Sequence, residues 1–205
     1  MKKILTILVL VTVIPACIFA GNIFGLTVGA TAAYQKTIND SIDNSESAEQ
    51  FFKDLKVEDF KFGADVDVKV LVVDVNAKGF VAKNADEQTT LNGIVSANLA
   101  IDIFFVRVKA GLGYQYAYNT ETKAFHFGNN DNSAGFVTSF EGFKNAQFDI
   151  YAGVDFKLGP VVVGAYATLP TGVSIENGKW ADIFSTIEEN WGKALVGVSV
   201  GFAIL

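Results

Sequence analysis

The sequence predicts an all-β fold: an eight-stranded antiparallel up-and-down transmembrane β-barrel with short helices in its long loops. Three observations support this prediction. Apolar residues alternate with polar or small ones along eight segments, which is the period of a β-strand with two different faces. Long polar loops and tight turns alternate between these segments. Half of the 205 residues are hydrophobic and the mean hydropathy is +0.32, yet beyond residue 20 no apolar run approaches the ~20 residues of a membrane helix.

The alternation places the elements in chain order. We expect strands over residues 24–35, 60–69, 73–78, 95–103, 106–118, 147–156, 161–169 and 193–205. Tight turns fall near residues 70, 104 and 159; the last contains Gly159-Pro160, whereas the first has no Gly, Pro or Asn. The long loops are 36–59, 83–91, 119–145 and 170–192, with short helices expected over 47–55 and 180–189. All long loops therefore lie at one end.

A weak internal repeat supports this topology. Asp67, Asp102 and Asp155 each stand on the polar face just before a tight turn, and an apolar-alternating return strand follows each of them. Three similar hairpins imply a meander and not a Greek key.

The N-terminus is typical of a secretory signal peptide. Lys2 and Lys3 precede an apolar run over 4–14, Pro15 ends that run, and small residues follow. We expect cleavage after Ala20, which makes 1–20 the signal peptide and 21–205 the barrel domain. A second interpretation is a cut before Cys17, because residues 14–17 resemble a lipoprotein box; the chain would then be lipidated at Cys17.

The two faces of the strands differ in a way that predicts which one is outside. The polar face is rich in Gly, Ser, Ala and Thr, which suits the crowded lumen of an eight-stranded barrel. The charges on this face nearly balance, as charges held away from water must, and we expect them to form a lumen network. Its members are Lys61, Asp65, Asp67, Lys69, Asp74, Lys78, Asp102, Arg107, Lys109, Asp149, Asp155, Lys157 and Lys193. The apolar face carries no charge, as a lipid-facing surface requires.

Aromatic residues gather near both ends of the strands. Two such belts are what the two interfaces of a bilayer select. The expected members are Phe24, Tyr34, Phe60, Phe62, Phe105, Tyr116, Tyr118, Phe156, Trp191 and Phe202.

Several classes of function find no support in the residues. The net charge of −6 argues against nucleic acid as a partner. Residues 129–133 have the oxygen-rich spacing of a calcium loop, but Ala134 and Phe140 replace its Gly and closing Glu, so we expect a turn and no metal or cofactor. His126, the sole histidine, shares its loop with Ser133, Ser139 and Glu141, but residues 124–128 are more typical of an aromatic loop strand. We therefore expect no enzyme.

The signal peptide, the eight alternating strands, the long loops at one end and the final strand together resemble the small outer-membrane β-barrels of diderm bacteria, the OmpA-like, OmpX-like and OmpW-like proteins. The last strand resembles a barrel-insertion signal, although it ends in Leu205 instead of an aromatic residue. The resemblance implies a bacterial outer-membrane location, contact with outer-membrane lipid and with the barrel-insertion machinery, and loops that face outside.

This architecture suggests a structural, surface-exposed role in which the long loops contact external proteins or glycans. Two alternatives stay open. One is a small channel for small or apolar solutes. The other is a soluble-barrel lipoprotein anchored through Cys17.

Overall fold

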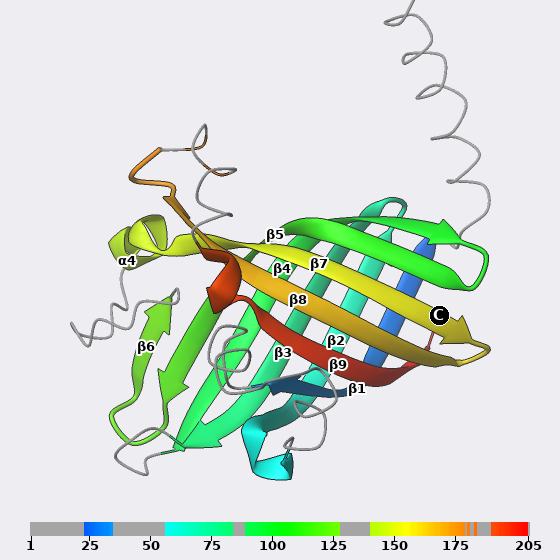
Figure 1. The fold of residues 1–205 in the computed structure, drawn as a ribbon, viewed down its shortest axis with the longest axis horizontal. Coiled ribbons are helices and arrows are strands. Elements are labelled where there is room, and N and C mark those ends of the chain that lie inside the picture. Colours follow the sequence, from blue (N-terminus) through cyan, green and yellow to red (C-terminus); the bar gives the residue numbers. More distant parts are fainter. Residues whose placement is uncertain are drawn as a thin grey trace, which may run out of the picture.

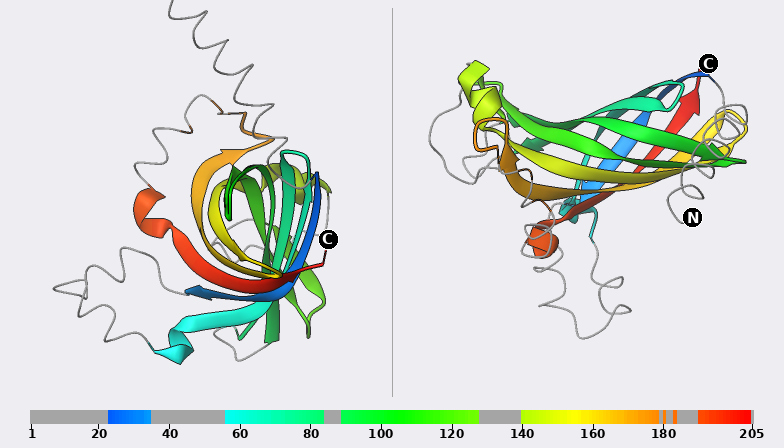
Figure 2. Two further views of the ribbon diagram at one scale, coloured as in Figure 1. Left: turned by 90° about the vertical axis from the view of Figure 1, so that its right-hand side faces the viewer. Right: turned by 90° about the horizontal axis from the view of Figure 1, so that it is seen from above.

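The computed structural model describes residues 23–34, 56–83, 89–127, 140–178, 180, 183 and 190–204, which form a closed antiparallel barrel (Figure 1). Each barrel strand pairs with the next along the chain, and β9 pairs with β1 to close the ring, which is seen nearly end-on in Figure 2. The strands of the barrel are β1 (Phe24–Tyr34), β2 (Phe60–Val70), β3 (Val73–Lys83), β4 (Thr89–Ile103), β5 (Val106–Asn119), β7 (Gln147–Leu158), β8 (Val161–Ser174) and β9 (Leu195–Ala203). The predicted all-β, eight-stranded, up-and-down barrel is confirmed.

The three tight turns lie where the sequence predicts them. Each has two residues, at 71–72, 104–105 and 159–160. Leu71, Phe104 and Gly159 have positive φ (58°, 53° and 67°), while the second residue of each turn does not, which is the pattern of a type II′ hairpin turn. Glycine is the usual residue at that position, because a positive φ is unfavourable for residues that have a Cβ atom. Leu71 and Phe104 adopt this unfavourable conformation.

At the opposite end β3, β4 and β8 run further than the alternation predicts. β4 begins at Thr89 and not near residue 95, because Lys83 still pairs with Thr89 across a short loop. The expected loop 119–145 contains two described elements: β6 (Ala124–Phe127) pairs back on β5, as expected for an aromatic loop strand, and α4 (Phe140–Asn145) follows.

β8 corrects a second boundary. We expected this strand to end before Pro170, but it continues to Ser174. Pro170 lies opposite Asp149, next to a register shift of the β7–β8 ladder between Gln147 and Asp149. A proline, which lacks the backbone N–H, is tolerated in a sheet at such an irregularity.

Two one-turn 3-10 helices, η1 (Val57–Asp59) and η3 (Trp191–Lys193), lead into β2 and β9. The helix expected over 47–55 and most of that over 180–189 lie outside the described residues. Among the residues that are described, no helix is long and apolar enough to cross a membrane.

Candidate functional site

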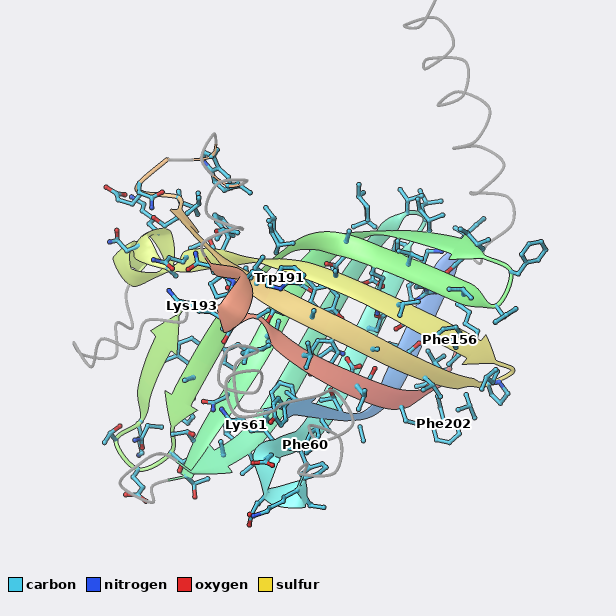
Figure 3. The ribbon with its side chains drawn as sticks, viewed as in Figure 1. Phe60, Lys61, Phe156, Trp191, Lys193 and Phe202 are labelled. Carbon is cyan, nitrogen blue, oxygen red and sulfur yellow. The ribbon has the colours of Figure 1, made fainter. Side chains whose placement is uncertain are left out.

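The barrel has a charged, buried interior and an exposed apolar wall. Along β4, for example, Ser96, Asn98 and Asp102 point inward and are buried, whereas the alternating Leu99 and Ile101 are exposed. The same inversion holds around the ring, so that hydrophobic side chains cover the outside (Figure 3). The lumen is therefore the candidate site for polar chemistry, and the wall is a candidate contact surface.

One carboxylate joins the three tight hairpins inside the lumen. Asp102 accepts hydrogen bonds from Arg107 Nε (2.8 Å to Oδ1) and from Lys69 Nζ, and it pairs with Lys157 Nζ (2.9 Å). Lys69, Asp102, Arg107 and Lys157, which we call the turn-end cluster, come from the hairpins that turn at residues 71, 104 and 159. Because all are buried except Lys157, whose side chain is 25% exposed, the cluster cross-links the hairpins in a region of low dielectric.

A second layer of ion pairs lies deeper in the lumen. Arg107 Nη1 reaches Asp67 at 3.2 Å and Asp74 at 3.8 Å. Lys109 Nζ lies between two carboxylates, 2.7 Å from Asp67 and 2.8 Å from Asp155. Asp67 and Arg107 thus connect this layer to the turn-end cluster, and the charges of these two layers form one continuous network.

The middle of the lumen is filled by two tyrosines. The rings of Tyr151 and Tyr166 stack with their centroids 5.9 Å apart and 10° between their planes. The Lys78 ammonium lies 4.4 Å from the centre of the Tyr166 ring and pairs with Asp65 at 2.6 Å. The hydroxyl of Thr31 bonds that of Tyr166 at 3.2 Å. These contacts, with the buried Ala33, Phe80 and Ile94, make an aromatic and apolar layer across the barrel.

The structure places the predicted lumen charges as follows. Ten of the thirteen form ion pairs inside the barrel: Asp65, Asp67, Lys69, Asp74, Lys78, Asp102, Arg107, Lys109, Asp155 and Lys157. Asp149 is buried and accepts a hydrogen bond from Gln115 Nε2 at 2.6 Å, and Lys61 is half-buried near the start of β2.

The placement of Lys193 in the lumen is corrected. This residue is exposed and belongs to η3, because β9 begins only at Leu195 and the helical turn breaks the alternation. Without Lys193, the expected set contains six Lys or Arg and six Asp, so its formal charge is zero.

The predicted aromatic residues divide by exposure. Six are exposed on the outside: Phe24, Phe62, Phe105, Phe156, Trp191 and Phe202. Phe60, Tyr116 and Tyr118 are half-buried, and Tyr34 is buried with its ring 5.4 Å from that of Phe60. Phe156 and Phe202 lie toward the tight-turn end and Phe60 toward the other (Figure 3).

Sequence reasoning missed the uncharged partners of the network. Tyr151 and Tyr166 close the middle of the lumen, and Asn98 donates to Asp74 at 3.1 Å. Their signal was present, because the alternation along their strands places them on the inward face. Sequence reasoning also missed an outer aromatic group. The ring centroid of Tyr114 lies 4.4 Å from that of Phe148 and 4.9 Å from that of Phe143 in α4.

Of the residues considered for catalysis and metal binding, the structure describes the secondary structure of two. His126 belongs to β6 and Glu141 to α4, while Ser133, Ser139 and the segment 129–133 lie outside the described residues. Within the described ranges, no group of three or more His, Cys, Asp or Glu is placed to hold a metal ion. No protein-family model matches the sequence, and no curated protein matches it either.

Proposed function

We propose that this chain is an integral β-barrel of a bacterial outer membrane with a structural, surface-exposed role. The observation that carries the proposal is the inversion of the barrel: its charges are inside and its exposed wall is apolar. In water, an exposed apolar surface beyond a few hundred Å² marks an interaction surface. Around a barrel, the partner that covers such a wall on all sides is lipid.

The composition of the wall supports lipid as its surroundings. On β9, Val196, Val198, Val200 and Phe202 are all exposed, and they alternate with Gly197, Ser199 and Gly201, which are buried or half-buried. A Lys or Arg at the middle of a lipid-facing wall costs about 2–4 kcal/mol, and the outward positions of the barrel strands carry none except Lys83, which is the last residue of β3 and therefore stands at the end of the wall. The strands, 9 to 15 residues long, reach the ~9–11 residues that a tilted strand needs to cross a bilayer.

The packed lumen favours a structural role over a channel. Ion pairs fill the tight-turn half, and the Tyr151–Tyr166 layer with Lys78 crosses the middle. We expect the purified protein to give no stable conductance in planar bilayers, and the double variant Tyr151→Ala, Tyr166→Ala to raise it. Stable conductance of the unchanged protein would instead favour the small channel for small or apolar solutes.

The end with the long loops is proposed to face outside. There β6 extends beyond the barrel and α4 packs on its rim through Phe143, so this end offers surface for external proteins or glycans. The exposed face of β9 is the proposed contact for the insertion machinery. We propose no catalytic role for His126.

Carbonate extraction of membranes and gel mobility with and without boiling test the proposal. We expect the protein to resist carbonate and to migrate differently once boiled, because a barrel in lipid or detergent unfolds only on heating. A Cys17→Ser variant serves as the control and is expected to behave identically. Release of the Cys17→Ser variant alone would favour the soluble-barrel lipoprotein. Release of the unchanged protein by carbonate without a mobility shift would contradict insertion of the barrel in the membrane.

A further inference from the structure

The tips of the three tight turns carry no polar side chain. They comprise residues 70–73, 103–106 and 158–161, with the sequences Val-Leu-Val-Val, Ile-Phe-Phe-Val and Leu-Gly-Pro-Val. We propose that these turn tips are immersed in the membrane leaflet at that end of the barrel, so that lipid covers them. This inference rests on the proposed outer-membrane location and extends it from the wall to the end of the barrel.

The side chains of the turn tips are exposed. Phe104 is 93% exposed and Leu158 60%, and Leu71 and Phe105 are exposed as well. Hairpin turns that face water are dominated by Gly, Asn, Asp, Ser and Pro. Of these types only Gly159 and Pro160 occur in the tips, so the composition is that of a surface that meets an apolar medium.

The charged side chains next to each tip point into the lumen and not outward. Lys69 and Asp74 flank the first tip, Asp102 and Arg107 the second, and Lys157 precedes the third. All five point into the lumen and form ion pairs there. Among the described residues, the rim of this end therefore has no outer collar of charge that would hold it in water.

Backbone strain gives an independent argument. Gly159 shows that this type of turn accepts glycine, yet Leu71 and Phe104 occupy the equivalent position with φ of 58° and 53°. A left-handed conformation costs a residue with a side chain roughly 1–2 kcal/mol. Because Leu71 and Phe104 are exposed, packing within the described barrel does not offset this cost. Strain that the fold does not require points to a use for the side chain.

Backbone groups of the tips are also hydrogen-bonded, as an apolar medium requires. The carbonyl oxygens of Val72, Phe105 and Pro160 accept hydrogen bonds from the next strand, over 2.8, 2.6 and 2.8 Å. The N–H of Leu71 donates to the carbonyl oxygen of Ile23 at 2.6 Å. Pairing of backbone groups at the turns is what immersion in lipid demands.

The height of the barrel wall agrees with immersion. An outer-membrane barrel presents an apolar band about 25 Å tall, and strands tilted by about 40° with a rise of about 3.3 Å per residue need roughly 10 residues to span it. The strands β2 and β3 have 11 residues each. An apolar band of this height therefore extends along β2 and β3 as far as the turn tips. The tips continue the apolar wall, and no polar residue separates them from it.

Site-directed spin labelling tests the position of the tips. In a Cys17→Ser background, which removes the sole cysteine, Phe104→Cys and Leu158→Cys are labelled and the protein is placed in phosphatidylcholine vesicles. Collision of the label with oxygen reports lipid, and collision with a water-soluble nickel chelate reports water. Val198→Cys, in the exposed wall, and Glu58→Cys, in the exposed η1, are the matched controls. Leu158 has an ordinary φ, so this variant covers the case in which Phe104→Cys fails to fold.

We expect the ratio of oxygen to nickel collision at residues 104 and 158 to be several-fold higher than at 58 and close to that at 198. A lipid-like ratio at 198 with a water-like ratio at the tips would overturn this inference and leave the proposed location intact. Water-like ratios at 198 and at both tips would overturn both. Tips shielded from oxygen and nickel alike would mean that a second copy covers them, which also contradicts immersion in lipid.

Discussion

Replacing Asp102 by Asn removes the charge that holds the three tight hairpins together while keeping the shape of the side chain. In the described part of the chain, Asp102 is the sole carboxylate within ion-pair distance of Lys69 and of Lys157, whereas Arg107 retains Asp67 at 3.2 Å. Lys69 is buried, so Asp102→Asn leaves the Lys69 ammonium in the interior without a counter-charge.

The size of the effect follows from this burial. Removing one partner of a buried ion pair costs about 3–5 kcal/mol, because an uncompensated charge is left in the interior. We therefore expect Asp102→Asn to lower the free energy of unfolding by about 3–5 kcal/mol. Lys157→Gln is expected to cost about 1 kcal/mol or less, because that side chain is partly exposed and its charge is screened by water.

Urea unfolding of the folded barrel, followed by tryptophan fluorescence and by the temperature of the gel shift, measures both variants. The double variant Asp102→Asn, Lys69→Met should recover part of the loss, since it removes the stranded charge as well. If Asp102→Asn is no more destabilising than Lys157→Gln, the turn-end cluster does not stabilise the barrel. That result would refute the reasoning.

Two further predictions concern packing. Gly111→Ala should reduce the yield of heat-modifiable barrel sharply, because a Cβ there would overlap the carbonyl oxygen of Ala97, while Gly79→Ala, whose Cβ would have no neighbour closer than 3.7 Å, should fold as the unchanged protein does. Thr31→Val should lower the urea midpoint by the equivalent of about 1–2 kcal/mol, since it removes the hydroxyl that bonds Tyr166 and a backbone carbonyl of β9. Equal yields of the two glycine variants, or an unchanged midpoint for Thr31→Val, would contradict these predictions.

The positions of the strands and tight turns could be read from the sequence for a geometric reason. A two-residue turn reverses the strand and shifts the outward positions from even to odd numbers, so that Val70 and Val73 both face out. The slip in alternation therefore marks the turn even where, as at Leu71, no Gly, Pro or Asn is present. Ile103 and Val106 show the same slip.

The sequence did not predict where the strands end near the long loops. It also did not predict which side chains pair inside the lumen. Around Thr89 both faces are polar, so alternation disappears although pairing continues. Alternation also tells which face a charge occupies but not which charge it meets, because tilted strands bring together residues that are not opposite each other in the sheet. Asp102 pairs with Lys69, 33 residues away and on a strand that does not neighbour its own.

The seam between β1 and β9 determines when the barrel can form. Every other ladder of the ring joins strands that follow one another along the chain, whereas the seam pairs residues 27–33 with residues 197–203. Until β9 has been made, the remaining strands can form only an open sheet, with β1 as an unpaired edge that can recruit other chains. Loop-closure entropy opposes so distant a pairing, so the seam is expected to form last in folding. Deleting β9 would not yield a smaller barrel but an aggregating sheet, and the nascent chain must be shielded until closure.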